Sequence, residues 1–255
     1  MTISEIREIL KKDDVPEEVL KEILSDERKG VRNLAASYMR RLERESRERM
    51  RVEALYEVES EFYKRGMTHI VGIDEVGRGP LAGPVTVAAV ILKPHWFAPG
   101  LNDSKKVTLK HREALSARIH EEAVDLSIVS MPPSEIDAVN IYQATMEAMY
   151  QAVKNLHVKP DAVIVDAMPL HFSCPTISMI HGDARSASVA AASIAAKVYR
   201  DHLMDEYDEK YPGYGFARNK GYGTAEHIEA LRRLGITPIH RKSFEPVKSM
   251  IFEGW

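Results

Sequence analysis

Apolar residues in the first 66 positions recur at the spacing of amphipathic helices. Ile3, Ile6 and Leu10 follow one another every three or four residues, and a second such series comes soon after. Residues 31–63 then keep apolar side chains at helical spacing within a stretch that is otherwise strongly charged. The pattern predicts a small helical N-terminal region over residues 1–66, with short helices followed by one long, charged helix.

Beyond residue 66 the chain changes to short apolar runs that alternate with helical periodicities. The runs that have the length and β-branched content of strands cover residues 69–74, 84–92, 126–130, 162–166 and 177–181. Helical spacing covers residues 108–122, 135–156, 186–210 and 224–234. This order predicts an α/β domain over residues 67–255, with a mixed sheet flanked by helices and a C-terminal helical segment.

The composition is that of an ordinary globular protein and excludes several other classes. The 255 residues are 44% hydrophobic and 29% charged, with a formal net charge of −3. Cys174 is the one cysteine, which excludes an intrachain disulfide and a cysteine-rich zinc site. The longest apolar run, residues 81–92, is shorter than the roughly 20 residues that span a bilayer. We therefore expect a cytoplasmic protein that works without a membrane.

One segment departs from this nearly neutral balance. Residues 28–51 contain nine Arg or Lys against three Glu, a local excess of +6. One interpretation is a solvated helix face on which opposite charges pair one turn apart. The other is an auxiliary contact with nucleic acid that is held by charge alone.

Acidic side chains stand where predicted strands end. Asp74 and Glu75 close the first run, Asp166 closes the run at 162–166, and Asp183 follows the run at 177–181. Each acid alone fits a turn or a helix cap, but the set of four is hard to explain in that way. Oxygen ligands without cysteine or paired histidines favour magnesium or manganese. The sequence therefore predicts a divalent-metal site built from Asp74, Glu75, Asp166 and Asp183.

The turn directly after the first two acids reads Gly77-Arg78-Gly79. Glycines expose the backbone and permit a close approach, and the arginine adds a fixed positive charge. Such a turn suits a phosphate or a sugar held against the main chain. Lys197 and Arg200 lie one helical turn apart further along the chain and are candidates to reach phosphates.

Several short segments of the chain form an ordered set of motifs: residues 72–80, 102–105, 165–166, 182–183 with 191–197 and 200–201, 220–224, and 238–244. In this order they resemble the motifs of type 2 ribonuclease H, the ribonuclease HII family of bacteria. The resemblance covers about residues 69–247, and residues 1–66 lie outside it as an extension that some members have. Val76 and Ala195 depart from the usual residues without touching the chemistry.

The resemblance implies an RNase H-like fold and an endoribonuclease. Its substrates would be RNA/DNA hybrids and duplex DNA that contains a single ribonucleotide, cut on the 5′ side to leave a 3′-hydroxyl and a 5′-phosphate. The four acids would be the catalytic and metal-binding residues of a two-metal mechanism. Further substrate contacts are implied for two groups of residues. Gly77, Arg78, Gly79 and Tyr222 would recognise the ribonucleotide and its neighbour, and Ser104, Lys105 and Lys197 would hold phosphates.

Two other functions stay open at this stage. A DNA-directed nuclease or strand-transfer enzyme of the same fold would also cluster acids around two metals, although the glycine-arginine turn and Tyr222 argue against it. A non-catalytic hybrid-binding protein would use the arginine-rich helix as its main contact, although four intact acids argue against that. We expect a monomer, and the sequence leaves the roles of His240 and Arg241 undecided between bracing the C-terminal segment and touching substrate.

Overall fold

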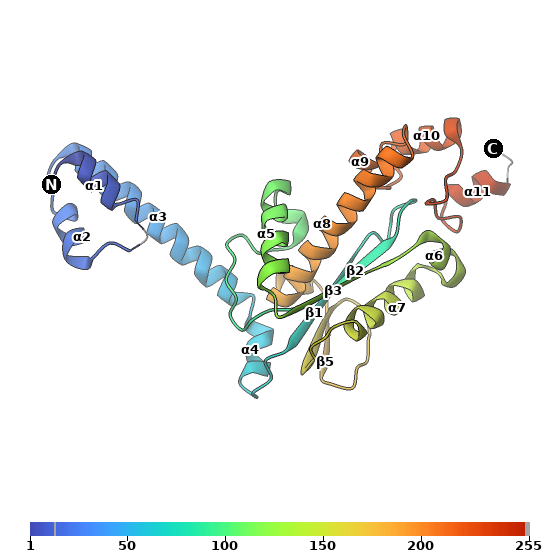
Figure 1. Cartoon of the computed structure of the whole chain (residues 1–255), viewed down its shortest axis with the longest axis horizontal. Helices are drawn as coiled ribbons and strands as arrows, with labels where there is room; N and C mark the ends of the chain where they lie inside the picture. Colours follow the sequence, from blue (N-terminus) through green and yellow to red (C-terminus); the bar gives the residue numbers. More distant parts are fainter. Residues whose placement is uncertain (13, 253–255) are drawn as a thin grey trace. The chain divides into compact units, whose positions relative to one another are not determined.

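The computed structural model describes residues 1–12 and 14–252, and the chain divides into two compact units (Figure 1). Residues 1–51 form one, here called the N-terminal unit, and residues 52–255 form the other, the sheet unit. The division falls inside a helix, whereas the sequence places a domain boundary after Gly66. That boundary stays a prediction about the domains.

Three helices build the N-terminal unit: α1 (Ile3–Ile9), α2 (Glu17–Leu24) and most of α3 (Lys29–Ala54). Thr2 begins α1 with a capping box that it shares with Glu5. The apolar stripes of the three helices meet in one small core around Ile6, Ile23 and Val31. The long helix expected over residues 31–63 is wrong in one respect, because α3 ends at Ala54 and a separate helix follows, α4 (Glu57–Tyr63).

The sheet unit contains five strands in the order β3-β2-β1-β4-β5. Their bounds are β1 (Ile70–Val76), β2 (Val85–Ile91), β3 (Asp125–Met131), β4 (Ala162–Asp166) and β5 (Thr176–Met179). β1, β2 and β3 form an antiparallel meander, and β4 and β5 add on the other side in parallel. The predicted mixed sheet is confirmed. β5 ends earlier than expected because His181 turns the chain with a φ of 59°.

The helices of this unit follow the predicted order, with additions. They are α4, which belongs to this unit, and α5 (Leu109–Glu122), α6 (Pro133–Val139), α7 (Ile141–Lys154), α8 (Ala187–Lys210), α9 (Phe216–Asn219), α10 (Ala225–Leu234) and α11 (Val247–Phe252), with short 3₁₀ turns η1 (Ser104–Lys106) and η2 (Gly182–Ala184). The single helix expected over residues 135–156 is two. Asn140, at a φ of 71°, breaks it, and its side chain accepts hydrogen bonds from the first amides of α7.

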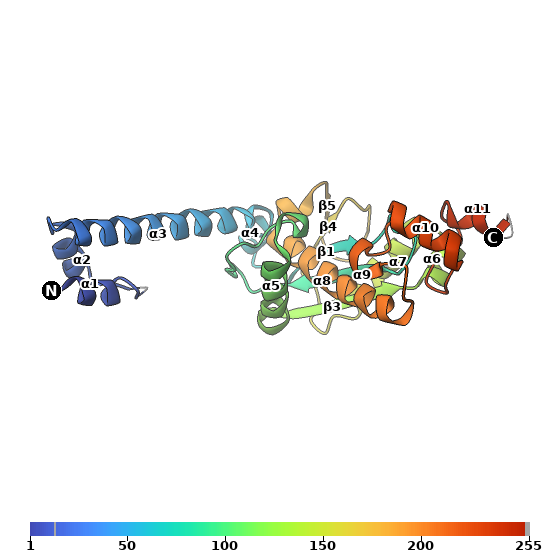
Figure 2. The ribbon, with the colours of Figure 1, turned by 90° about the horizontal axis from the view of Figure 1, so that it is seen from above.

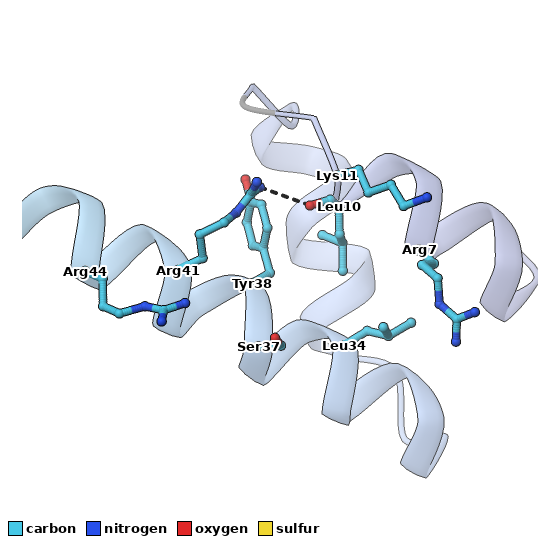
Figure 3. Close-up of a pocket in the computed structure, with 8 residues that line it drawn as sticks. All are labelled: Arg7, Leu10, Lys11, Leu34, Ser37, Tyr38, Arg41 and Arg44. Atoms are coloured by element: carbon cyan, nitrogen blue, oxygen red, sulfur yellow. Dashed lines mark hydrogen bonds between the residues drawn. The ribbon is translucent and has the colours of Figure 1, made fainter. Parts of the chain in front are cut away.

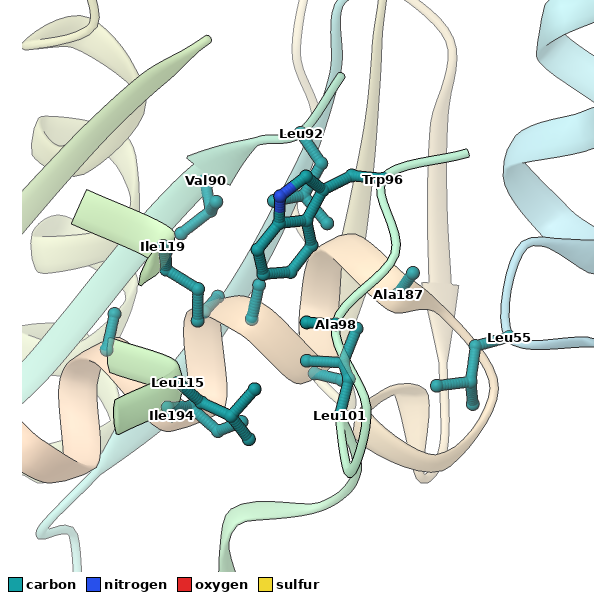
Figure 4. Packing of buried hydrophobic residues seen from close by; sticks show 14 of the residues in the cluster. Leu55, Val90, Leu92, Trp96, Ala98, Leu101, Leu115, Ile119, Ala187 and Ile194 are labelled. Carbon is teal, nitrogen blue, oxygen red and sulfur yellow. The ribbon is translucent and has the colours of Figure 1, made fainter. Parts of the chain in front are cut away.

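The two faces of the sheet are covered by different helices (Figures 1 and 2). Ala88 and Val90 of β2 pack with α5 and α8, whereas Val87 and Ala89 pack with α7, as the alternation of strand side chains requires. Trp96, Leu115 and Ile119 fill the first of these layers (Figure 4).

α8 lies very close to β1. A Cβ atom at Gly72 would come within 2.1 Å of the Ser188 backbone, so only glycine permits this approach. Among the helices the structure describes, none combines the length and apolar character needed to cross a membrane.

Candidate active site

The ends of β1 and β4 bring two of the predicted acids together. The parallel pairing sets Gly72 opposite Ile164 and Ile73 opposite Val165, and one further step places Asp74 next to Asp166. Gly72 faces α8, so Asp74, two residues on, faces α8 as well. Ile164 packs with Val189 of α8, which gives Asp166 the same orientation. Neighbouring strands therefore direct both carboxylates to one face of the sheet.

The third strand end contributes Asp183 through a turn. The amide of Gly182 donates to the Asp166 carboxylate at 2.9 Å, which holds η2 against the end of β4. Asp183, the next residue, is 9% exposed. Glu75 lies beside Asp74 at the end of β1, and its carboxylate receives the Arg78 guanidinium at 3.2 Å. The structure thus gathers all four acids that the sequence singled out.

The pKa values of Asp74 and Glu75 are raised by burial and by the charges of neighbouring acids. Burial raises the pKa of Asp74 well above its ordinary range, and the charges of Glu75 and Asp166 raise it further. Burial also raises the pKa of Glu75, and Asp166 adds to this while Arg78 opposes it. Asp74 and Glu75 are therefore ionised at a cost in free energy, which a nearby cation would relieve.

The donors fit a hard divalent cation. All four acids offer carboxylate oxygens, and the buried Oε2 atom of Glu75 has no hydrogen-bond partner among the described residues. In the described part of the chain, no group of three or more His, Cys, Asp or Glu side chains is arranged so that it could hold a metal ion without rearrangement. The charges of Glu75 and Asp166 act on Asp74, and Glu75 keeps one carboxylate oxygen without a partner among the described residues.

Two residues that the sequence analysis passed over also belong to the site. Burial raises the pKa of Asp183, and the charge of Asp103 is the next cause, so Asp103 lies beside it. The Ser193 hydroxyl is 2.9 Å from that of Ser104 and is also within hydrogen-bonding reach of Asp74. Asp103 stands in a matched motif and could have been found there. Ser193 also stands in a matched segment, residues 191–197, but its alanine-rich surroundings favour packing as the explanation.

Buried arginines, rather than contacts with solvent, shape the glycine turn. The Arg241 guanidinium donates to the carbonyls of Gly77, Arg78 and Gly83. Arg200 donates to the carbonyls of three other residues, Pro84, Lys220 and Ala82. Both arginines are fully buried. The expectation that Arg200 reaches phosphates is therefore wrong for this structure, and Arg241 braces the turn.

The other predicted substrate residues differ in how exposed their side chains are and in whether they are already paired. A Cβ atom on Gly79 would lie 3.7 Å from the Tyr222 ring, so the two residues are neighbours, and Tyr222 is 47% exposed. Lys105 is exposed, whereas Ser104 is buried. Lys197 is paired with Asp201 at 2.6 Å.

A buried histidine pair supports the backbone at Tyr222. His227 Nδ1 bonds the Tyr222 carbonyl at 2.9 Å, so it carries the proton, and its Nε2 lies 3.0 Å from Nε2 of His240. His240 Nδ1 accepts from the Thr237 amide at 2.9 Å. Every ring nitrogen is used when both histidines are neutral. His240 is thus a structural residue in this arrangement.

Glu59 of α4 holds the start of α8 and was not singled out from the sequence. Its Oε1 accepts from the Ser186 hydroxyl at 2.6 Å and from the Ser188 amide at 3.0 Å, and the residue is fully buried. A carboxylate at a helix N-terminus meets free amides and the positive end of the helix dipole. Glu59 therefore anchors the helix that carries Ser193 and Lys197.

Comparison with known families matches nearly the whole chain. The family model of ribonuclease HII matches residues 71–247, and the family model of the ribonuclease HII N-terminal domain matches residues 2–63. The ribonuclease HII of Desulfitobacterium hafniense (strain Y51) is 50% identical over 252 residues, which is 98% of this chain and 96% of that protein. The ribonuclease HII of Ligilactobacillus salivarius (strain UCC118) is 47% identical over 253 residues, 99% of each.

Solved structures show the same fold for the sheet unit. Ribonuclease H2 from Pyrococcus horikoshii OT3 superimposes with a TM-score of 0.64 at 25% identity, covering 72% of this chain and 97% of that one. Bst-RNase HIII in complex with Mn²⁺ gives a TM-score of 0.55 at 18% identity, covering 73% and 70%. The predicted α/β RNase H-like fold is thereby confirmed.

Proposed function

The chain belongs to the ribonuclease HII family of ribonuclease H-type hydrolases, and from this premise we propose how it selects and cuts its substrate. It hydrolyses the RNA strand of RNA/DNA hybrids and cuts on the 5′ side of single ribonucleotides within duplex DNA, leaving a 3′-hydroxyl and a 5′-phosphate. The observation that carries the proposal is the convergence of Asp74, Glu75, Asp166 and Asp183 beside a bare glycine turn.

The four acids would hold divalent metal, manganese or magnesium. Asp103 lies beside Asp183 and would add its carboxylate to that side of the site. The Mn²⁺ complex of the structurally similar RNase HIII supports the choice of metal. Such ions, when bound by these acids, would activate a water for attack on the phosphodiester and stabilise the charge on the leaving oxygen. Asp74 and Glu75 position them because burial and mutual repulsion favour their ionised forms only beside a cation. The Ser193 hydroxyl opposes the effect of burial and lowers the pKa of Asp74.

Backbone groups of Gly77, Arg78 and Gly79 recognise the 2′-hydroxyl, which distinguishes RNA from DNA. The Arg78 side chain is engaged with Glu75, so the turn reads the sugar through its main chain, and Arg241 keeps that main chain rigid. Tyr222 stacks on the sugar of the following deoxyribonucleotide with its exposed ring. Ser104, Lys105 and Lys197 hold phosphates. Lys105 is exposed, whereas Ser104 is buried and Lys197 is paired with Asp201.

The decisive test compares an all-DNA duplex with the same duplex carrying one ribonucleotide, in magnesium or manganese. We expect one cut on the 5′ side of the ribonucleotide and none in the all-DNA duplex. Cutting of both would favour a DNA-directed nuclease, and binding without cutting would favour a hybrid-binding protein. Tyr222→Ala should lower the cutting rate sharply at an isolated ribonucleotide; an unchanged rate would remove Tyr222 from recognition. Monomeric action stays a prediction.

A further inference from the structure

A pocket of about 290 Å³ opens on the N-terminal unit, and none of its lining residues belongs to the candidate active site (Figure 3). It lies between α1 and α3, and all of its lining comes from residues 1–51. Four of the lining side chains are basic and none is acidic. The lining residues are Arg7, Leu10, Lys11, Leu34, Ser37, Tyr38, Arg41 and Arg44.

One of the basic residues forms the wall of the pocket. The Arg41 guanidinium donates to the carbonyls of Leu10 at 3.0 Å and Lys12 at 3.1 Å, and it lies 5.2 Å from the centre of the Tyr38 ring. Leu10 and Tyr38 are themselves buried in the core of the unit. Arg41 therefore ties the end of α1 to α3, so that the pocket is formed before any ligand arrives.

The remaining basic side chains are available to a ligand. Arg7 and Arg44 are exposed, and neither has an ion-pair partner among the residues that the structure describes. Lys11 pairs with Glu8 at 2.7 Å, but both side chains are more than 60% exposed, and such surface pairs contribute little. Two guanidinium groups and one ammonium thus belong to residues that line the pocket, and its lining includes no acid (Figure 3).

The charge of this unit is separated along the chain rather than mixed. Residues 13–27 contain seven Asp or Glu and one Lys, a balance of −6, whereas residues 28–51 have a balance of +6. A helix face that is merely solvated carries interspersed charges of both signs. Three arginines of α3 pair with glutamates of the same helix, Arg41 with Glu45, Arg47 with Glu43 and Arg51 with Glu48, and the pocket is lined by basic residues of this segment and of residues 7–11.

We propose that this pocket binds phosphates of a nucleic-acid duplex, as a second contact separate from the catalytic carboxylates. Guanidinium groups bind phosphate oxygens through paired hydrogen bonds, and several of them on an open surface suit a polyanion better than a single small anion. The identity of the duplex, a hybrid or a ribonucleotide-containing DNA, rests on the function proposed above. The pocket itself reads no sequence, because phosphate contacts carry none.

The test measures duplex affinity of the full chain by fluorescence anisotropy, without divalent metal so that nothing is cut. The double variant Arg7→Ala/Arg44→Ala is compared with Lys21→Ala/Arg47→Ala. The second removes the same charge from the same unit, at residues that are held in exposed ion pairs. Both should keep the wild-type melting temperature.

We expect the slope of log Kd against log salt to fall by about 1.8 for the first variant, about 0.9 per lost phosphate contact, with affinity roughly tenfold weaker. The control should keep the wild-type slope. Equal losses in both variants, or an unchanged slope in the first, would overturn the proposal. Saturable binding of inorganic phosphate alone, lost in the first variant, would assign the pocket to a small anion instead.

Cleavage of the ribonucleotide-containing duplex in manganese is measured separately on the same proteins. A chain that binds with the expected slopes but never cuts would refute the proposed function and leave this site standing. A chain that cuts normally while its first variant keeps the full slope would refute the site alone.

Discussion

The two units use arginine in opposite ways. In the sheet unit Arg200 and Arg241 are fully buried and donate to backbone carbonyls around the glycine turn. In the N-terminal unit Arg7 and Arg44 are exposed and have no acidic partner within the described residues. A buried guanidinium must satisfy its donors inside the protein, and only a few carbonyl-rich turns allow this.

The difference teaches that charge type alone does not reveal a phosphate site. Arg200 lies in a matched motif and on the same helix as Lys197, yet its guanidinium is buried and donates to backbone carbonyls. The basic residues of α3 look like an ordinary solvated helix, yet two of them line a pocket whose lining includes no acid. Burial and hydrogen-bond partners, which depend on tertiary packing, decide between the two roles.

The largest expected effect comes from neutralising an acid of the sheet unit. Asp74→Asn should lower cleavage by at least ~10³-fold, because it removes a charge that holds the metal. It should also leave the metal-free protein as stable as the wild type or more so, since it relieves repulsion with Glu75 and Asp166. Single-turnover cleavage and urea unfolding without metal measure the two effects.

Asp26→Asn in the N-terminal unit is the matched control for that substitution. Asp26 is paired with Arg28 on the surface, and its loss should leave cleavage unchanged. Near-normal turnover by a folded Asp74→Asn protein would exclude Asp74 from the metal site. A comparable loss in Asp26→Asn would contradict the assignment of catalysis to the sheet unit.

The next effect tests the buried arginines. Arg241→Met keeps the length of the side chain but leaves the carbonyls of Gly77, Arg78 and Gly83 without their donor. Each unsatisfied buried carbonyl costs about 1–3 kcal/mol, so we expect the free energy of unfolding to fall by about 3–5 kcal/mol. Cleavage should fall in the fraction that still folds. A loss under about 1 kcal/mol in urea unfolding would show that the guanidinium does not brace the turn.

The strands and the main helices could be predicted from the sequence because they depend on local pattern. The four acids could be singled out because they stand in an ordered set of motifs. Prediction from the sequence failed where long-range contacts decide the outcome. Glu59 looks like a surface acid on a charged helix, and only the fold brings it to the first turn of α8. Asn140 splits a continuous helical pattern through a positive φ that periodicity does not reveal. The burial of Arg241 likewise depends on a turn more than 150 residues away.

The loss of stability that comes from histidine protonation should affect the sheet unit and not the N-terminal unit, because residues 1–51 contain no histidine. Burial and the neighbouring His227 lower the pKa of His240 from 6.5 to about 4. The unfolded chain therefore binds more protons between these values, and the stabilisation is complete above pH 6.5 and lost as pH falls towards 4. The loss should approach about 3 kcal/mol in the sheet unit.

His240→Gln is the variant that isolates this effect, since the raised pKa values of Asp74 and Glu75 act in the opposite direction in both proteins. Both tryptophans, Trp96 and Trp255, lie in residues 52–255, so tryptophan fluorescence follows urea unfolding of the sheet unit alone. We expect the wild type to lose stability more steeply than the variant between pH 6.5 and 4.5. Parallel pH profiles would show that His240 does not titrate with folding.

The smallest expected effect on stability completes the comparison of arginines. Arg44→Met makes the same replacement as Arg241→Met, but at an exposed side chain with no ion-pair partner in the described structure. The free energy of unfolding, followed by far-ultraviolet circular dichroism, should change by no more than about 0.5 kcal/mol. The variant should nevertheless bind the duplex more weakly than the wild type, because one phosphate contact is lost. Should Arg44→Met instead destabilise the chain as Arg241→Met does, Arg44 would be a structural arginine too, and the basic pocket would lose one of its two unpaired guanidinium groups.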